Sequence, residues 1–275
     1  MRLATSFGRK YNVIRSNEPL QNEQLLQAVP SIFAEDKHES RSVRYTYIPT
    51  IQILDELRKE GFQPFYAAQS RVRDEGNREH TKHMIRLRHA SQIAAQETNE
   101  IILVNSHNGT SSYQMLAGVF RFVCANGMVC GDSMQDIRVP HKGDVLSQVI
   151  DGAITVLDTF DIVSDQMQGM KALKLDSREQ EAFARAALTL KYDDEAAPAP
   201  ITENDLLRIK RAADTSSDLW TTFNRVQENM IQGGLRGRSA TGKTIKTRPV
   251  TGIDQNIKIN RALWTLAEEM KKLKA

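Results

Sequence analysis

Cysteine is scarce in this sequence, and its scarcity excludes one class of protein. The chain has 275 residues but two cysteines, Cys124 and Cys130, which are too few for a disulfide scaffold. Their separation fits neither a redox pair nor a zinc knuckle, so we expect two small buried residues in a strand or hairpin. A reducing cytoplasm is the simplest compartment for such a chain.

Long apolar runs are also missing. No run approaches the roughly 20 residues that a membrane-spanning helix needs, and the longest, at 101–104 and 128–129, have the length of strands. The N-terminal segment 1–16 is basic but lacks the apolar core of a signal peptide. We therefore expect a cytoplasmic protein without a membrane partner, whose N-terminal segment belongs to the mature chain.

The chain carries only a small excess of positive charge. Lysine and arginine number 37 against 34 acidic residues, so the formal net charge is +3. This balance does not by itself indicate a nucleic-acid partner, because the distribution of charge matters more than its sum. With 40% hydrophobic residues, a chain of this length can bury a sizeable core.

An acidic, Ala/Pro-rich stretch at 192–202 indicates a linker. Pro198 and Pro200 exclude a helix through it. We therefore predict an α+β core domain at 1–191, the linker at 192–202, and a helical C-terminal region at 203–275 that carries a basic, glycine-rich strap.

Apolar periodicity predicts the α+β fold of the core, an antiparallel sheet flanked by helices. Period-two alternation indicates strands, whereas helical spacing with Pro49 at its start and Gly61 at its end indicates a helix over 49–61. Segment 113–123 fits either a strand or a short helix. Strands are expected over 62–73, 81–89 and 100–107. Further helices are expected over 22–29 and 177–190, and one long helix or two over 144–176.

The most glycine-dense segment, 233–248, contains a match to the phosphate-loop pattern G-x-x-x-x-G-K-[ST] in Gly237, Gly242, Lys243 and Thr244. A phosphate loop follows a buried strand and opens a helix, whose N-terminus binds phosphate. Here a helical pattern precedes the match, and β-branched residues and a proline follow it. We expect the match to be incidental, and a nucleotide-dependent enzyme is the weakest of three hypotheses.

The same segment concentrates the positive charge of the chain. Residues 230–260 include six basic residues against one acidic residue, a net charge of +5 that exceeds the +3 of the whole chain. Glycines let backbone N–H groups approach phosphates, and arginine binds phosphate through two donors. Two alternatives stay open, a solvated loop and a segment that packs on acidic surface of the protein itself. The residues predicted to contact a phosphate backbone are Arg236, Arg238, Lys243, Lys246 and Arg248.

A second basic surface is expected on the predicted strands, close to Phe65 and Tyr66. Charged strand faces with aromatic residues bind single strands, because bases stack on rings while cations hold the backbone. The alternative is the solvent face of an antiparallel sheet, where charge protects the edges. The cations concerned are Arg71, Arg73, Lys82, Arg86 and Arg88.

Histidine and serine residues give little support for catalysis. His80 and His83 are three residues apart, a spacing that suits a metal on a helix but not on a strand, so we expect neither metal nor cofactor. His107 precedes the loop 108–112, but no nucleophile-elbow pattern accompanies it. We expect no catalytic residue, and a binding protein rather than an enzyme.

Several long blocks carry a family resemblance. They are 29–33, 40–42, 45–50, 61–64, 81–84, 100–131, 228–230, 237–239, 257–264 and the closing helix. Together they resemble the prokaryotic phage/plasmid-like protein family, a domain of unknown function. The resemblance covers nearly the whole chain and implies a mobile-element setting, in DNA metabolism, recombination or evasion of host defence. The block shared with the family is Gly-Arg-Ser, which would make Lys243-Thr244 incidental.

The predicted order of a helix, antiparallel strands and a long helix is similar to the core of single-strand annealing proteins of the RecT, Red-beta and Erf types. Those proteins bind single strands in a basic groove and form rings or filaments, and the similarity concerns the fold alone. The leading hypothesis is a single-stranded DNA-binding protein of a mobile element, a homo-oligomer that assists strand annealing or recombination. The alternative is an anti-defence or regulatory factor that binds a host or phage recombination or defence protein.

Overall fold

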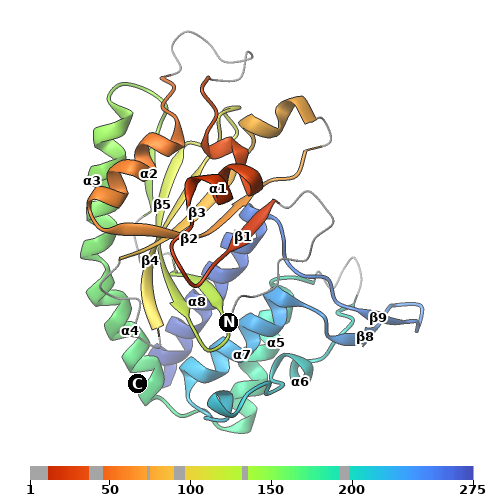
Figure 1. The fold of residues 1–275 in the computed structure, drawn as a ribbon. Helices are drawn as coiled ribbons and strands as arrows, with labels where there is room; N and C mark the ends of the chain where they lie inside the picture. The colour runs from red at the N-terminus through yellow and green to blue at the C-terminus, as the bar shows by residue number, and fades with distance from the viewer. Residues whose placement is uncertain are drawn as a thin grey trace. The chain divides into compact units, whose positions relative to one another are not determined.

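The protein is described by a computed structural model over residues 12–36, 46–72, 75–89, 97–131, 136–192 and 198–274. The chain divides into two compact units, and Figure 1 labels the helices and strands of both. Unit 1 comprises residues 1–120 and 134–159, and unit 2 comprises residues 121–133 and 160–275. The prediction of an α+β fold with an antiparallel sheet and helices is confirmed.

Unit 1 is built on a sheet in which the strands follow the order β1-β2-β3-β4-β5, and β7 pairs with β5. The pairs β1–β2, β2–β3, β3–β4 and β5–β7 are antiparallel. The apolar run 101–104 lies on β4 and is buried, as is typical of apolar residues in a central strand. The strands are β1 (Val13–Arg15), β2 (Phe62–Gln69), β3 (His83–His89), β4 (Glu97–Asn105), β5 (Tyr113–Arg121) and β7 (Ile137–Val139).

Three helices accompany this sheet, α1 (Asn22–Ala28), α2 (Thr50–Lys59) and α3 (Val145–Asp158). Helix α2 follows Pro49 and buries Ile53, Leu54 and Leu57. The sequence predicts the apolar stripe as Ile51, Leu54 and Leu57, and Ile51 is only half-buried. The predicted helix over 49–61 is therefore confirmed. Segment 113–123, for which a strand and a helix were both open, forms β5.

Unit 2 is assembled around α7 (Leu219–Gln232), which contacts four other helices of the unit. Trp220 and Phe223 of α7 lie with ring centroids 6.1 and 6.0 Å from that of Trp264 on α8. These three rings are buried and form the apolar centre of the unit. The other elements of unit 2 are α4 (Phe160–Ala172), α5 (Ser177–Thr189), α6 (Glu203–Leu206), α8 (Ile253–Lys274), β6 (Asn126–Val129), β8 (Arg236–Arg238) and β9 (Thr244–Lys246).

The compact units divide the chain at positions other than 192–202. Helices α4 and α5, which precede that stretch, belong to the same unit as α6, α7 and α8, which follow it. Residues 193–197 lie outside the described residues, so the linker at 192–202 stays a prediction.

Candidate nucleic-acid interface

The basic segment forms an antiparallel β-hairpin of β8 and β9 in unit 2. Arg236 pairs with Lys246, Gly237 with Ile245, and Arg238 with Thr244. At the tip, the Gly242 amide donates to the Ser239 carbonyl (2.8 Å), and Gly242 has a φ of 79°. A turn followed by a left-handed glycine is a common closure of short hairpins. The predicted strap therefore has a defined strand register.

This hairpin lacks the backbone arrangement of a phosphate loop. Gly237 lies inside the short, exposed strand β8 instead of following a buried strand, and β9 rather than a helix follows Lys243. Without a helix N-terminus at Lys243, the segment has no converging backbone donors for a nucleotide phosphate.

One face of the hairpin packs against Pro200 and Ile201. A Cβ atom added at Gly237 would overlap the carbonyl oxygen of Pro200 and lie 2.8 Å from its carbonyl carbon. The Arg238 amide donates to the same carbonyl oxygen at 2.8 Å. Glycine at 237 therefore serves the close approach of two backbones.

The cations of β8 and β9 lie on the opposite face. Successive side chains alternate along a strand, and directly paired residues point to the same side. Because Gly237 faces Pro200, the side chains of Arg236, Arg238 and the paired Lys246 point away from it. All three are exposed, as are Lys243 and Arg248. Within the described part of the chain, none of these five side chains has a hydrogen-bond or ion-pair partner.

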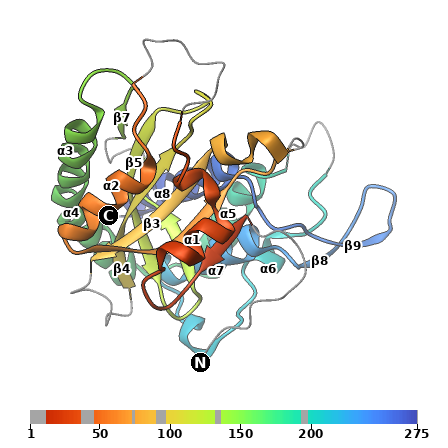
Figure 2. The same cartoon turned by 45° about the horizontal axis from the view of Figure 1, so that its top comes forward.

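The base of the hairpin is held by Lys191, which lies just after α5. Its Nζ donates to the carbonyl of Met230 (2.8 Å) and to that of Arg248 (2.9 Å), one on each side of the hairpin. Burial lowers the pKa of this amine from its usual value. The Gly234 amide also donates to the Thr247 carbonyl at 2.8 Å. From this fixed base the hairpin extends away from the helices of unit 2 (Figure 2).

Arg86 and Arg88, predicted on an exposed strand face, are 4% and 1% exposed. The Arg86 Nη1 and the Arg88 Nε each donate to the Glu100 carboxylate at 2.8 Å. The Arg88 guanidinium also lies 3.5 Å from the ring centroid of Phe120. Burial lowers the pKa of Arg88, which Glu100 partly offsets. The prediction that these two arginines line an exposed surface is therefore wrong.

The other predicted strand cations lie in unit 1 as well. Arg71 is exposed just after β2, and Lys82 is half-buried directly before β3. Arg73 lies outside the described residues. A nucleic-acid contact through Arg71 and Lys82 stays a prediction.

The family described as "Domain of unknown function (DUF932)" matches residues 37–264 of the chain. The chain belongs to the DUF932 family. A relative from Escherichia coli (strain K12), the UPF0380 protein YafZ, is 57% identical over 269 residues, covering 98% of this chain and 97% of the relative. The UPF0380 protein YfjQ of the same organism is 56% identical, with the same coverage. No solved structure matches the chain significantly.

The match confirms the expected membership of a family of unknown function. The DUF932 region includes the whole β8–β9 hairpin and Lys191, but the names of the relatives state no activity. Any function for this DUF932 protein must therefore be argued from its residues.

Sequence reasoning missed a buried polar cluster in unit 1, centred on Thr50 at the start of α2. His83 donates through Nδ1 to the Thr81 carbonyl (3.2 Å), which leaves its Nε2 to accept from the Thr50 hydroxyl (2.9 Å). Asn105 donates to the Thr50 Oγ1 at 3.1 Å, and its Oδ1 lies 2.9 Å from the His141 Nε2. These hydrogen bonds connect α2, β3, β4 and the segment after β7.

Burial keeps the histidines of this polar cluster neutral. It lowers the pKa of His83 to about 4 and that of His107 to about 2, and it also lowers the pKa of His141. Thr50 is 0% exposed, so its hydroxyl has no path to a substrate. Among the described residues, no group of three or more His, Cys, Asp and Glu is placed to hold a metal. The cluster stabilises unit 1 and has no visible binding role.

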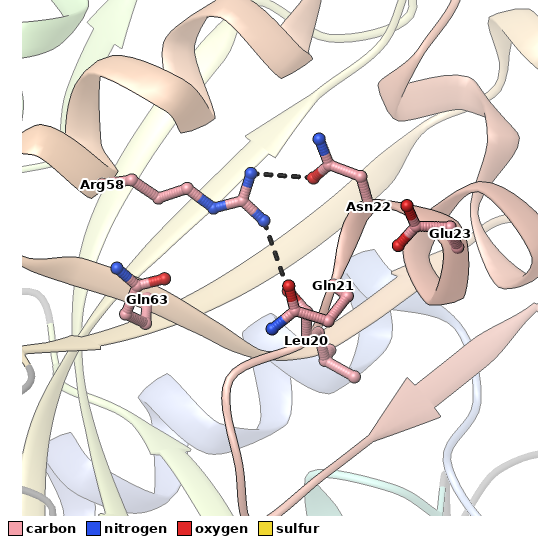
Figure 3. A pocket seen from close by; sticks show the side chains of 6 residues that line it. All are labelled: Leu20, Gln21, Asn22, Glu23, Arg58 and Gln63. Atoms are coloured by element: carbon pink, nitrogen blue, oxygen red, sulfur yellow. Dashed lines mark hydrogen bonds between the residues drawn. The ribbon is translucent and has the colours of Figure 1, made fainter.

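A polar hollow of about 340 Å³ lies in unit 1 beside the start of α1 (Figure 3). Arg58 points across it and donates to the Asn22 Oδ1 (2.7 Å) and to the Leu20 carbonyl (3.2 Å). It also donates to Asp55 at 2.9 Å, so its guanidinium is already occupied. The hollow therefore offers little to an anionic ligand. Its lining consists of Leu20, Gln21, Asn22, Glu23, Arg58 and Gln63.

No helix in the described ranges has the length and apolar character needed to cross a bilayer.

Proposed function

We propose that this protein binds nucleic acid, and single-stranded DNA first of all, through phosphate contacts of the β8–β9 hairpin. The observation that carries the proposal is the one-sided face of Arg236, Arg238 and Lys246. These side chains are exposed, and none has an acidic partner among the described residues. The hairpin face with Gly237 is packed against Pro200, so the cationic face is the one turned outward.

The pairing of Arg236 with Lys246 also supports a polyanionic ligand. Like charges directly opposite each other in an antiparallel pair destabilise it, because their side chains start about 5 Å apart. Phosphates bound between them would turn this repulsion into attraction, and arginine can bind a phosphate through two donors.

One alternative for this segment was contact with acidic surface of the protein itself. Among the described residues, the hairpin cations contact no acidic side chain. The Pro200 carbonyl accepts from a backbone amide of the hairpin and not from one of its cations. Residues 193–197 lie outside the described residues, so the binding experiment must exclude both contact with acidic surface and a solvated hairpin without a ligand.

The wider role in the proposal follows from the resemblance to the phage/plasmid-like family. A protein of a mobile element that holds single strands by their backbone would assist annealing or recombination and act as a homo-oligomer. Binding without base recognition suits this role, because annealing must accept any sequence.

The test compares three full-length proteins for binding to a labelled single strand and to a duplex at low salt. The first is unaltered, the second carries Arg236→Gln, Arg238→Gln and Lys246→Gln, and the third carries Lys59→Gln, Arg178→Gln and Lys272→Gln. The third is a matched control, because it removes the same charge from exposed positions on α2, α5 and α8.

We expect the hairpin variant to bind single strands at least about tenfold more weakly and the control to stay within about twofold, since phosphate contacts dominate such affinities. Absence of any binding by the unaltered protein would refute the proposal. Capture of one stoichiometric protein partner, without DNA affinity, would favour the protein-binding hypothesis instead.

A further inference from the structure

The composition of the hairpin limits what it can recognise. Residues 233–250 include no aromatic residue, no histidine, no asparagine or glutamine, and no acidic residue. Proteins that recognise unpaired bases stack them on aromatic rings or on arginine guanidinium planes, and hydrogen-bond their edges with such polar side chains. Of these groups, the outward face offers only the guanidinium planes of Arg236 and Arg238.

Ile245, an apolar residue of the hairpin, does not lie on the outward face and cannot serve there as a platform for bases. Ile245 is 36% exposed, but it pairs with Gly237 and therefore shares the face that packs against Pro200. Arg236, Arg238 and Lys246 share their face with Thr244, which offers a short hydroxyl. A ligand on this face meets cations and one small polar group.

The spacing of the cations suits a chain of phosphates. Arg236 and Arg238 are two residues apart on one face, which corresponds to about 6.6–6.8 Å along the strand. This distance is similar to that between successive phosphates of an extended single strand. Lys246 lies opposite Arg236 and can reach the same phosphate from the second strand.

We infer that the hairpin recognises the sugar–phosphate backbone alone and leaves the bases in solvent. The ligand class is then a chain of regularly spaced phosphodiesters, whatever its bases. This inference rests on the proposed function and makes it more specific.

The experiment measures the affinity of the full-length protein at low salt for four single strands of equal length. They are an oligothymidine, an oligodeoxyadenosine, an oligouridine and an abasic deoxyribose–phosphate chain. The abasic chain keeps every phosphodiester and lacks every base, and the oligouridine tests whether the ribose hydroxyl contributes.

We expect all four affinities to agree within about threefold, because they share one charge spacing. An abasic chain that binds tenfold or more weakly than oligothymidine would show base contact and overturn the inference, while the proposed function would stand. An oligouridine that binds tenfold more tightly would show contacts to the ribose hydroxyl and overturn it as well. No binding to any of the four would refute the proposed function itself.

Discussion

Gly237 and Pro200 approach so closely that no side chain fits between them. A Cβ atom at 237 would overlap the Pro200 carbonyl oxygen, to which the Arg238 amide donates at 2.8 Å. This contact decides which face of the hairpin is turned outward, and therefore where Arg236 and Arg238 point.

Gly237→Ala should displace β8 from Pro200 without changing any charge. We expect faster hydrogen exchange of the Arg238 amide and weaker binding of single strands, since overpacking of this kind destabilises by about 1–3 kcal/mol. Gly234→Ala is the control, because a Cβ atom there meets nothing within 4 Å, although its φ of 79° adds backbone strain. If Gly237→Ala binds as well as the unaltered protein, the packing at Pro200 does not position the cations.

Lys191→Met should weaken binding without removing a phosphate contact. Its amine holds the carbonyls of Met230 and Arg248 at the base of the hairpin, and loss of both bonds frees that base. We expect a several-fold loss of affinity with an unchanged salt slope, whereas Arg236→Gln should make the slope shallower by about 0.7. The measurement is a salt titration of both variants. Equal changes of slope would mean that Lys191 itself contacts the ligand.

Glu100→Gln should destabilise the protein. It removes the charge that compensates Arg86 and Arg88 in a buried site, and breaking such a pair typically lowers the free energy of unfolding by about 3–5 kcal/mol. The exposed pair of Glu56 with Lys59 provides the control, since Glu56→Gln should change stability by less than about 1 kcal/mol. Urea unfolding measures both. A stable Glu100→Gln variant with increased DNA affinity would restore these arginines as candidate phosphate contacts.

Stability should fall as the pH drops below about 6.5. Burial lowers the pKa of His83 to about 4, so the unfolded chain binds more protons than the folded one between these values. The contribution of His83 to stability is complete above its pKa in the unfolded chain. It is lost as the pH falls toward its pKa in the folded protein. His83 faces Thr50, His107 and the Thr81 carbonyl, none of which is acidic.

Urea unfolding between pH 6.5 and 5 measures this effect while most carboxylates stay ionised. At one pKa unit per 1.36 kcal/mol, His83 alone would contribute up to about 3 kcal/mol by pH 4. His83→Gln should make the profile shallower, with the remaining slope due to His107 and His141. A flat profile for the unaltered protein would mean that the buried histidines do not titrate as their burial implies.

Local sequence patterns predict the helices and strands of this protein better than they predict which residues pack against them. The apolar spacing of Ile51, Leu54 and Leu57 predicts α2, and the alternation around Arg86 predicts β3. The same alternation places Arg86 and Arg88 on one face but does not say what covers that face. The structure provides Glu100 and Phe120 as partners, and neither lies in the same local window.

The glycines of the hairpin show a similar limit. In the sequence, Gly237 and Gly242 look like parts of a phosphate loop, whereas in the structure one packs on Pro200 and the other closes a turn. The cluster of Thr50, His83 and His141 had no signal at all, because its members are far apart in the chain. Such sites depend on tertiary contacts that no short pattern contains.

The central claim is that the hairpin cations bind phosphates, and the salt dependence of single-strand affinity tests it most directly. Five phosphate contacts should give a log–log slope near about −3.5, and the Arg236→Gln, Arg238→Gln, Lys246→Gln variant should fall to about −1.4, since two contacts remain. A slope near zero for the unaltered protein, or an unchanged slope in the variant, would contradict the account.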